Sequence, residues 1–576
     1  MSFEDTYKLW AAQDHLSPEL RADMTRLAKD DEAREDAFAV PMSFGTAGMR
    51  GTYGAGINRF NEYTVAQATA GLARYMDELG DDAKQAGVAI SFDSRHNSEM
   101  FAHVAALVLG AVGIKTYVFD SLRPTPELSF AVRDLHAFAG IMITASHNPK
   151  QYNGYKLYGA DGGQLPPEAS DKITTYVRKV TDLFSIERAN ESDLRASGLM
   201  RLIGEDVDQD YLDNVATVTI NHDLVKRVGA TMKLVYTPLH GTGKFPVMRS
   251  LQRAGFANFS MVKEQAIYDP EFITVTHPNP EFPEAFDLSI QEGRRIGADL
   301  LIATDPDADR LGAAVRIGDD YHLLTGNQIA SLLLHYILEA KKQAGTLPAD
   351  GAVIKSFVST ELADKICADY GVEMITVETG FKFIGDAIAG FEQNHDHTFL
   401  FGFEESYGYL IKPFVRDKDA VQSTLLLAEV AAYYQEQGKT LADGLHDLYE
   451  QYGYFSERTT SLEFTGLTGP KKMAALMTKF REEAPTDFAG TAIERTEDYL
   501  SGQARTQAGD TTTLTLPQSD VLKYYLTDGT WIAIRPSGTE PKVKFYIGVQ
   551  GDSEQAANAK LASYADALHA FAADAE

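Results

Sequence analysis

Short apolar runs alternate along the chain with longer stretches in which apolar residues recur every three or four positions. The runs at Val88–Phe92, Ala139–Thr144 and Leu300–Ala303 have the length and composition of buried strands. The stretch 65–79 instead has the period of an amphipathic helix, because its apolar residues fall on one face. Strands that alternate with helices in this way predict βαβ units and a mostly parallel sheet.

This alternation occurs three times, after an N-terminal helical segment in which Ser17 caps a helix that starts at Pro18. The strands expected in the three units are 88–92, 115–119 and 139–144, then 233–236, 259–262 and 299–303, then 352–357, 373–377 and 398–403. In the last part of the chain three strands precede a closing helix, at 522–526, 531–534, 543–549 and 556–572. Consecutive strands beside a helix are typical of an α+β domain.

The sequence therefore predicts an α/β protein of four domains. Three are related α/β units with mixed or parallel sheets, and the C-terminal one is an α+β domain. The length agrees, because 576 residues are enough for about four domains of ~150 residues each. We expect the domains to span residues 1–205, 206–325, 326–455 and 456–576.

The charge of the chain excludes some classes of partner. It has 53 Lys and Arg residues and 82 Asp and Glu residues, which give a net charge of −29. The sequence contains no cluster of basic residues. Such a chain repels nucleic acids and anionic membranes. It also lacks an apolar stretch of the ~18 residues that a membrane span needs, and the apolar core of a signal peptide. The single cysteine, Cys367, excludes an intramolecular disulfide framework. We expect a soluble cytoplasmic protein, and the sequence leaves its oligomeric state open.

Residues 43–51, Ser-Phe-Gly-Thr-Ala-Gly-Met-Arg-Gly, form the first loop with chemical potential. Its small residues allow the backbone to approach a ligand closely, and Arg50 can donate a fork of hydrogen bonds to a phosphate. The loop is not a nucleotide-binding Walker loop, because no Gly-Lys-Ser/Thr follows. A purely structural turn is the alternative.

The second loop begins at the end of the strand at 139–144 and continues through Lys156. Open α/β sheets bind ligands at such strand ends. Ser146 is a candidate nucleophile, and His147, Lys150 and Lys156 are cations that can hold a phosphate and move protons. We do not expect His147 to be the base for Ser146, because consecutive side chains on an extended backbone point apart. An ordinary turn is again the alternative.

The third loop places three carboxylates, Asp305, Asp307 and Asp309, directly after an apolar strand. Carboxylates at this spacing repel one another unless a divalent cation neutralises them, and ligands that are all oxygen favour Mg²⁺ or Mn²⁺ over zinc. An EF-hand is excluded, because the positions of its glycine and glutamate hold Arg310 and Arg316. A solvated acidic turn is the alternative.

The fourth loop, residues 402–408, has the sequence Gly-Phe-Glu-Glu-Ser-Tyr-Gly and also follows a strand. Its carboxylates and hydroxyls, Glu404 and Ser406 among them, suit the hydroxyls of a sugar. Paired carboxylates can also be the acid and base of a glycosidase. That alternative is weaker here, because the other loops suit anions. Upstream, the segment 379–382 opens a helix with Thr379, Gly380 and Lys382.

The fifth loop lies between two strands of the C-terminal domain. It brings an arginine, two hydroxyls and a glycine amide together in five residues, namely Arg535, Ser537, Gly538 and Thr539. This combination predicts a phosphate-binding loop. A plain hairpin would explain the glycine and the prolines but not the arginine and hydroxyls.

Together and in this order, the five loops resemble those of the α-D-phosphohexomutase family, most closely its phosphoglucomutase branch. The resemblance covers nearly the whole chain, and the serine and three-aspartate loops are its most specific parts. Members of that family have four domains, three of related α/β topology and a fourth that binds substrate phosphate. The resemblance implies interconversion of glucose 1-phosphate and glucose 6-phosphate, with glucose 1,6-bisphosphate as intermediate and activator.

The resemblance also assigns roles to residues. Ser146 would carry a phosphoryl group and, with Asp305, Asp307 and Asp309, would bind Mg²⁺. Lys156 would be a general acid or base, while Arg50, His147 and Arg310 would position the transferring phosphoryl group. Substrate would be bound by Thr379, Gly380, Lys382, Glu404, Ser406, Arg535, Ser537, Gly538 and Thr539.

The chain departs from common family members at a few positions. The first loop has Ala47 where many members have serine, and Pro306 and Ala308 stand where many have glycines. Lys382 stands where bacterial relatives that act on mannose often have histidine, so the second acid or base group stays open. Phosphomannomutase and phosphopentomutase are alternatives within the family. From other classes, a Mg²⁺-dependent sugar phosphatase and a non-catalytic sugar-phosphate sensor remain; a kinase is disfavoured, because no nucleotide phosphate loop is present.

Overall fold

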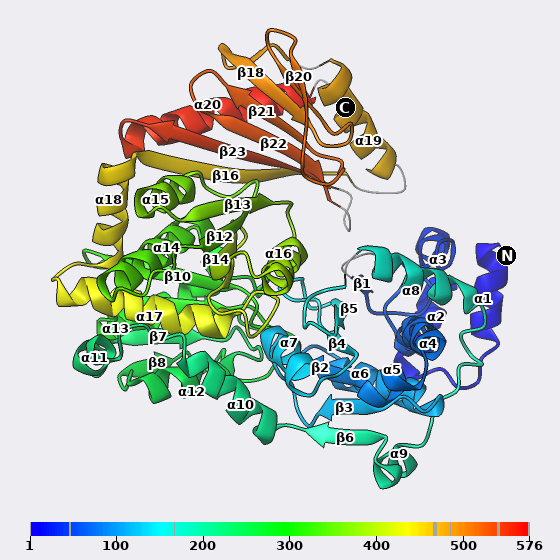
Figure 1. The fold of residues 1–576 in the computed structure, drawn as a ribbon. Helices are drawn as coiled ribbons and strands as arrows, with labels where there is room; N and C mark the ends of the chain where they lie inside the picture. The colour runs from blue at the N-terminus through cyan, green and yellow to red at the C-terminus, as the bar shows by residue number, and fades with distance from the viewer. Residues whose placement is uncertain are drawn as a thin grey trace. The chain divides into compact units, whose positions relative to one another are not determined.

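The computed structural model describes residues 2–44, 48–165, 167–464, 469–483, 485–537 and 542–573. The chain forms two compact units, whose elements are labelled in Figure 1. The first unit contains Met1–Gly326, Ile384–Gly402 and Ser406–Thr440. The second contains Asn327–Phe383, Phe403–Glu405 and Leu441–Glu576.

A six-stranded mixed sheet forms the first part of the first unit. Its strands are β1 (Met49–Thr52), β2 (Val88–Phe92), β3 (Thr116–Phe119), β4 (Ala139–Ile143), β5 (Tyr152–Gly159) and β6 (Met200–Ile203). Their order is β1-β5-β4-β2-β3-β6. Strands β4, β2, β3 and β6 are parallel, as the alternation predicts, whereas β5 and β1 are antiparallel additions at one edge.

Helices accompany this sheet and precede it. They are α1 (Phe3–Ala11), α2 (Pro18–Leu27), α3 (Asp31–Phe38), α4 (Glu62–Leu79), α5 (Asp81–Ala86), α6 (Ser98–Ala111), α7 (Thr125–Asp134), α8 (Pro167–Lys179), α9 (Glu191–Ser197) and α10 (Glu205–Ala216). Ser17 caps α2 as expected, because its side chain accepts a hydrogen bond from the amide of Leu20.

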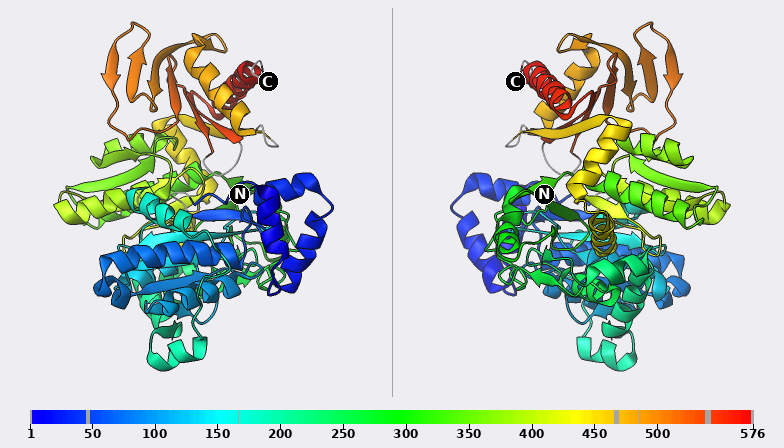
Figure 2. Two further views of the ribbon diagram at one scale, coloured as in Figure 1. Left: turned by 90° about the vertical axis from the view of Figure 1, so that its right-hand side faces the viewer. Right: turned by 90° about the vertical axis from the view of Figure 1, so that its left-hand side faces the viewer.

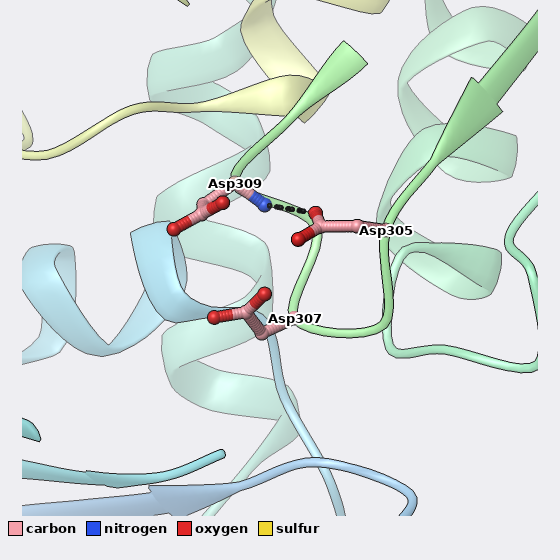
Figure 3. A group of neighbouring side chains, drawn as sticks. All are labelled: Asp305, Asp307 and Asp309. Atoms are coloured by element: carbon pink, nitrogen blue, oxygen red, sulfur yellow. Dashed lines mark hydrogen bonds between the residues drawn. The ribbon is translucent and has the colours of Figure 1, made fainter. Parts of the chain in front are cut away.

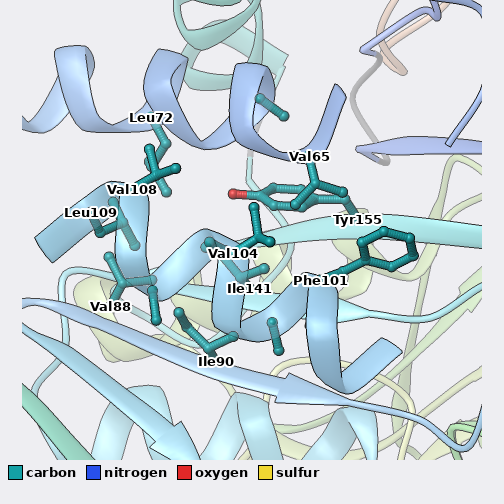
Figure 4. Packing of buried hydrophobic residues seen from close by; sticks show 14 of the residues in the cluster. Val65, Leu72, Val88, Ile90, Phe101, Val104, Val108, Leu109, Ile141 and Tyr155 are labelled. Carbon is teal, nitrogen blue, oxygen red and sulfur yellow. The ribbon is translucent and has the colours of Figure 1, made fainter. Parts of the chain in front are cut away.

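The core of this part lies between the sheet and helices α4 and α6 (Figure 4). Val65 and Leu72 from α4 meet Phe101 and Val104 from α6, and Ile90 of β2 lies beneath them. Burying each such side chain contributes about 1.5–3 kcal/mol. All five residues of β2 are buried, which explains its unbroken apolar sequence.

A five-stranded sheet follows in the same unit. It contains β7 (Leu234–Thr237), β8 (Phe259–Met261), β9 (Leu300–Thr304), β10 (Leu311–Ile317) and β11 (Asp320–Leu324), in the order β11-β10-β9-β7-β8. Strands β9, β7 and β8 are parallel, and β10 returns antiparallel to β9. Its helices are α11 (His222–Leu224), η1 (Val225–Gly229), α12 (Lys244–Ala254), η2 (Pro283–Phe286) and α13 (Asp287–Ile296).

Four elements lie wholly or partly in the later segments of the first unit: α16 (Phe381–Asn394), β14 (Thr398–Glu404), β15 (Gly408–Leu410) and α17 (Ala420–Glu436). Helix α17 is buried along most of its length. Asp419 caps it by accepting hydrogen bonds from the amides of Val421 and Gln422.

The second unit begins with α14 (Gly326–Gln343), β12 (Gly351–Ser356), α15 (Leu362–Tyr370), β13 (Glu373–Val377) and α18 (Leu441–Tyr452). Strands β12 and β13 are parallel neighbours. Because α15 connects them, β12, α15 and β13 form the βαβ unit expected from the sequence.

The C-terminal part of the second unit is an antiparallel sheet with helices on one face. The strands are β16 (Tyr454–Glu463), β17 (Asp487–Phe488), β18 (Thr491–Asp498), β19 (Gln503–Thr506), β20 (Thr511–Thr513), β21 (Leu522–Leu526), β22 (Trp531–Pro536) and β23 (Lys542–Gly551). The order is β16-β23-β22-β21-β18-β19-β20, and β17 pairs with β18. Helices α19 (Gly469–Glu482) and α20 (Glu554–Ala573) share one hydrophobic core with the sheet and lie on the same side of it (Figure 2). The α+β expectation for this part is confirmed.

Among the helices that the structure describes, none combines the length and the apolar character that are required to span a bilayer.

Candidate active site

The three aspartates of the third loop converge at the end of β9. Figure 3 shows Asp305, Asp307 and Asp309 pointing toward one another, and their carboxylates each offer an oxygen within 4.8 Å of the others. The loop turns at Ala308, whose φ of 51° is left-handed. The amide of Asp309 donates to Oδ1 of Asp305 at 3.1 Å and stabilises the turn. All three residues are buried, with exposed fractions of 0%, 0% and 2%. The solvated acidic turn is therefore excluded.

A neighbouring loop packs directly on the aspartate loop. The amide of Thr242 donates to the carbonyl of Pro306 at 2.8 Å. At Gly241 an added Cβ would lie 2.3 Å from Cα of Pro306, so only glycine allows this approach.

Lysine 156 neutralises part of the charge of the aspartates. Its Nζ lies 2.8 Å from Oδ2 of Asp307 and 3.4 Å from Oδ2 of Asp309. Burial alone would raise the pKa of Asp307, but the charge and hydrogen bond of Lys156 outweigh it and hold that pKa well below its usual range. Burial and then the charges of Asp307 and Asp309 instead raise the pKa of Asp305 well above its ordinary value. The pKa of Asp305 is therefore raised and that of Asp307 is lowered, although both carboxylates belong to the same site.

A second lysine, which the sequence pattern alone does not single out, also contacts this cluster. Nζ of Lys418 lies 3.2 Å from Oδ2 of Asp309 and 3.3 Å from Oδ1 of Asp417. Asp417 also accepts a hydrogen bond from the hydroxyl of Tyr158 at 2.9 Å. The available signal was the charged segment 416–419, Arg-Asp-Lys-Asp, directly before the apolar sequence of α17.

The donor set suits a divalent metal ion. Among the described residues, Oδ1 of Asp307 and Oδ1 of Asp309 are buried without a hydrogen-bond partner. Buried carboxylate oxygens in this state lose hydration without compensation, unless a cation takes them as ligands. Oxygen-only ligands are the type that Mg²⁺ and Mn²⁺ prefer. The aspartate group thus fits the metal that the sequence predicts.

Ser146 lies beside the aspartates. Its Oγ donates to Oδ2 of Asp305 at 2.6 Å, and Nδ1 of His147 lies 3.1 Å from the same Oγ. The expectation that His147 points away from Ser146 is therefore wrong. It assumed an extended backbone, whereas Ser146 has a left-handed φ of 51°, which brings adjacent side chains to one side.

The expectation that one loop continues from Thr144 through Lys156 also needs correction. Residues Tyr152–Gly159 form strand β5, which pairs antiparallel with β4. Lys156 is therefore presented by a strand opposite Met142, and not by a loop. A strand fixes the lysine more firmly toward the aspartates than a loop would.

Arg50 lies in β1, opposite Gly154 of β5. Its Nη1 donates to Oδ1 of Asn148 at 2.8 Å, so the arginine contacts the serine loop. Gly48 has a φ of +84°, and an added Cβ would lie 1.9 Å from the carbonyl oxygen of Tyr155. Residues 45–47 of this loop, including the Ala47 noted above, lie outside the described residues.

Arg310 follows the aspartates and contacts the fourth loop. Its amide donates to Oδ1 of Asp305 at 3.0 Å. Its guanidinium forms an ion pair with Glu281 and donates to the carbonyl of Ser406 at 3.1 Å. Within the first unit, the structure therefore brings the serine loop, Lys156, the aspartates and Arg310 together.

In the second unit, the structure brings Gly380 to Glu404. The amide of Gly380 donates to Oε1 of Glu404 at 2.6 Å. Nearby, the hydroxyl of Ser356 donates to Oε2 of Glu405 at 3.0 Å. Thr379 and Lys382, on either side of Gly380 in the chain, are partly buried.

Arg535 lies in β22 and faces Lys544 of β23 in the register of the sheet. The sequence alone does not single out Lys544, because only the pairing of strands places it beside Arg535. The amide of Ser537 donates to the carbonyl of Lys542 at 2.8 Å and closes the strand pair. Gly538 and Thr539 lie outside the described residues.

Comparison with protein families matches most of the chain to known domains. The four phosphoglucomutase/phosphomannomutase domains match in order: α/β/α domain I at residues 41–183, domain II at 209–318, domain III at 325–452 and the C-terminal domain at 477–563. The chain belongs to the phosphoglucomutase/phosphomannomutase family. It is therefore an isomerase of the phosphohexomutase type, and the predicted family and four-domain α/β fold are confirmed.

Individual relatives within the family agree with this assignment. The phosphoglucomutase of Staphylococcus epidermidis is 40% identical over 524 residues, which are 90% of this chain and 93% of the relative. The phosphoglucomutase of Staphylococcus aureus is 39% identical over 529 residues, which are 91% and 92% of the two chains.

Two solved structures share the fold. A putative phosphomannomutase from Thermus thermophilus has a TM-score of 0.67 at 23% identity and covers 92% of this chain and 99% of its own. The open form of the Paramecium phosphoglucomutase parafusin has a TM-score of 0.67 at 18% identity, with 93% and 96% covered.

Proposed function

We propose that this family member is a cytoplasmic, Mg²⁺-dependent phosphoglucomutase that interconverts glucose 1-phosphate and glucose 6-phosphate. The reaction would proceed through a phosphorylated Ser146 and a glucose 1,6-bisphosphate intermediate. The observation that carries the proposal is the 2.6 Å contact of the Ser146 hydroxyl with Asp305, inside the buried aspartate group. The relatives named phosphoglucomutase support the choice of a glucose phosphate.

In the proposed first half-reaction, phospho-Ser146 gives its phosphoryl group to a hydroxyl of the sugar phosphate. A divalent cation bound by Asp305, Asp307, Asp309 and the phosphoserine would offset the negative charge that develops on the transferring group. Nδ1 of His147, 3.1 Å from Oγ, would donate a hydrogen bond to that group.

Proton transfer and charge compensation would come from neighbouring cations. Nζ of Lys156, an ammonium group in its pair with Asp307, would donate a proton to Oγ of Ser146 as the phosphoryl group leaves it, and would then take up the proton of the attacking hydroxyl. Arg50 and Arg310 are placed by β1 and by the end of the aspartate loop, where they would position the phosphoryl group. The phosphorylated sugar then turns, and its other phosphate returns to Ser146.

Residues outside the serine and aspartate loops would hold the part of the substrate that does not react. Glu404 and Ser406 would accept hydrogen bonds from sugar hydroxyls, with Thr379, Gly380 and Lys382 beside them. The guanidinium of Arg535 would bind the non-reacting phosphate as a bidentate donor, together with Ser537, Gly538 and Thr539. Lys544, opposite Arg535 in the sheet, would add a second positive charge.

One assay tests the proposal: purified protein with glucose 1-phosphate, Mg²⁺ and a trace of glucose 1,6-bisphosphate. Formation of glucose 6-phosphate is expected; release of phosphate would indicate a phosphatase, and no turnover a sensor. Mannose and pentose phosphates in parallel test the alternatives within the family. Ser146→Ala should abolish turnover and the phosphoryl adduct in the intact mass, whereas the exposed Ser185→Ala should keep both. Full activity of Ser146→Ala would contradict the mechanism.

The domain boundaries at 205, 325 and 455 also remain a proposal. Limited proteolysis followed by mass spectrometry should cut near these positions. Cleavage concentrated within the predicted units would contradict them.

A further inference from the structure

The backbone of Ser146 is held in a conformation that a serine seldom adopts. Its φ of 51° lies in the left-handed region, which is unfavourable for a residue with a Cβ atom. Such a conformation persists only when the surrounding structure enforces it. The groups that enforce it therefore control where the Ser146 hydroxyl points.

One buried arginine binds the loop that contains Ser146. The guanidinium of Arg95 donates to the carbonyls of Ser146 and Asn148, to that of Pro149 at 2.9 Å and to that of Tyr152 at 3.0 Å. Its side chain is only 1% exposed. Four carbonyls within seven residues thus converge on one planar group, which a lysine could not bind in the same way.

Asp93 contacts Arg95 directly and is linked through Thr144 to the backbone amide of Ser146. Its Oδ2 lies 3.2 Å from Nε of Arg95, and it accepts a hydrogen bond from the hydroxyl of Thr144 at 2.7 Å. The Oγ1 of Thr144 in turn accepts from the amide of Ser146 at 2.8 Å. The amide and the carbonyl of Ser146 are therefore both fixed by the Asp93–Arg95 pair, one through Thr144 and the other directly.

The loop between β8 and η2, which contains Phe272, covers the arginine. The ring of Phe272 lies 5.0 Å from the guanidinium carbon, and Phe272 is itself buried. The next residue back, Glu271, pairs with His96 at 2.6 Å and with Lys150 at 2.5 Å. These contacts enclose Arg95 and leave its donors directed toward the serine loop.

We propose that Arg95 is a positioning residue for phosphoryl transfer, because it fixes the left-handed backbone that directs Oγ of Ser146 toward Asp305 and His147. The inference rests on the proposed function and assigns to Arg95 no contact with the substrate. Without the guanidinium, the loop relaxes and the hydroxyl or its phosphate ester leaves the aligned position. A misplacement of about 1 Å lowers the rate of transfer by about 100-fold.

The test compares Arg95→Lys and Arg95→Met with the wild-type holoenzyme in Mg²⁺. We expect kcat to fall about 100-fold, while KM for glucose 1-phosphate changes less than about threefold, since substrate binding uses other residues. Transfer of the phosphoryl group from glucose 1,6-bisphosphate to Ser146, followed by intact mass, should slow by the same factor. Added methylguanidinium should restore part of the rate of an Arg95→Ala variant.

The matched control is Arg123→Lys. Arg123 is also largely buried in the first unit but binds Asp208 at 2.7 Å and not the serine loop, so kcat should stay within about threefold. A folded Arg95→Lys or Arg95→Met with kcat and Ser146 phosphorylation within about threefold of wild type would overturn the inference.

If the Arg95 variants do not fold, Thr144→Val tests the same restraint with almost no change of shape. A kcat loss of at least about tenfold supports the inference, and a wild-type kcat overturns it. Absence of mutase turnover in the wild-type protein would contradict the proposed function and the inference together. Normal wild-type turnover with unaffected variants would contradict the inference alone.

Discussion

Lys156 should make the stability of the first unit depend on divalent cations. In the structure its Nζ is the counter-ion of Asp307 and Asp309, at 2.8 and 3.4 Å. Lys156→Met keeps most of the volume of the side chain and removes its charge. Asp307 then loses its paired lysine, and Asp309 loses one of its two lysines, in a place where water reaches the carboxylates poorly.

The expected magnitude follows from burial. The side chain of Lys156 is 8% exposed and that of Asp307 is 0% exposed. Breaking a buried pair by removing one partner costs about 3–5 kcal/mol, because the remaining charge stays uncompensated. The loss should be largest near neutral pH. Lys156 depresses the folded pKa of Asp307, so its contribution is present above the unfolded pKa and is lost as the pH falls through the folded pKa.

A divalent cation should replace the missing charge. The oxygens that Lys156 releases belong to the group that can hold a metal ion, so saturating Mg²⁺ should reduce the destabilisation of Lys156→Met to less than half. The same variant should bind Mg²⁺ more tightly than wild type, because one positive charge no longer competes for the carboxylates.

Urea unfolding measures both effects. The chain has two tryptophans, and only Trp10 lies in the first unit, so its fluorescence in a Trp531→Phe background reports on that unit. The control is Lys172→Met, whose pair with Glu78 is about half exposed on both sides and should contribute at most about 1 kcal/mol. Equal losses in EDTA for the Lys156 and Lys172 variants, or an equal Lys156 loss with and without Mg²⁺, would refute the reasoning.

Three further predictions concern burial and backbone conformation. Burial lowers the pKa of Lys523 to about 8. Between pH 8 and about 10.5 only the unfolded lysine keeps its proton, so the free energy of unfolding of the second unit should rise by about 3 kcal/mol over this range. Unfolding of Lys523→Met, measured against pH, should lack this rise. Burial raises the pKa of Asp419 to about 6, so the first unit should lose about 3 kcal/mol as pH rises from about 4 to about 6, because the unfolded carboxyl ionises first. Asp419→Asn, which keeps a cap for α17, should abolish that slope, and an unchanged slope would contradict the assignment. Gly48→Ala should destabilise the first unit by more than about 1 kcal/mol in urea unfolding, since its Cβ would clash with the backbone of β5. Gly80→Ala has a similar positive φ in open space and should cost less.

The sequence predicted those parts of the fold that depend on local pattern. Strands β2, β13 and β21 have the predicted bounds, because each is a short segment rich in apolar, β-branched or aromatic residues. The cap at Ser17 was also predictable, since a serine before Pro18 satisfies the first amides of a helix wherever it occurs. The aspartate loop was predictable for a similar reason, because its three carboxylates lie within five residues.

Strands without an apolar run were missed. Strand β5 contains Asn153, two glycines and Lys156, so its sequence resembles a turn, although the fold buries most of it. The same holds in the C-terminal sheet, where β20 is the exposed sequence Thr511–Thr513 and β18 is buried at only two positions. These strands are stabilised by pairing with their neighbours, and the partner in a sheet is not encoded in the strand itself.

The partners of the site residues were beyond sequence reasoning for the same reason. Lys418 and Asp309 are more than a hundred positions apart, and only the packing of α17 against the second sheet places them together. A single sequence offers a charged tetrapeptide before a helix, which occurs in many proteins without any function. Tertiary structure is what brings this common feature into contact with the aspartates of the candidate active site.

Ser146 and His147 show why residue identity alone does not determine the chemistry of this site. On an extended backbone the two side chains would diverge, and the histidine could not reach the hydroxyl. The left-handed φ of Ser146 reverses that relation and is unfavourable by itself, so it requires hydrogen bonds from residues elsewhere in the chain. Those bonds come from Thr144 and Arg95, and Arg95 lies fifty-one positions before the serine. A chain that kept the serine loop but lost the arginine would therefore retain the motif and lose the geometry, and a search for the motif would not distinguish the two.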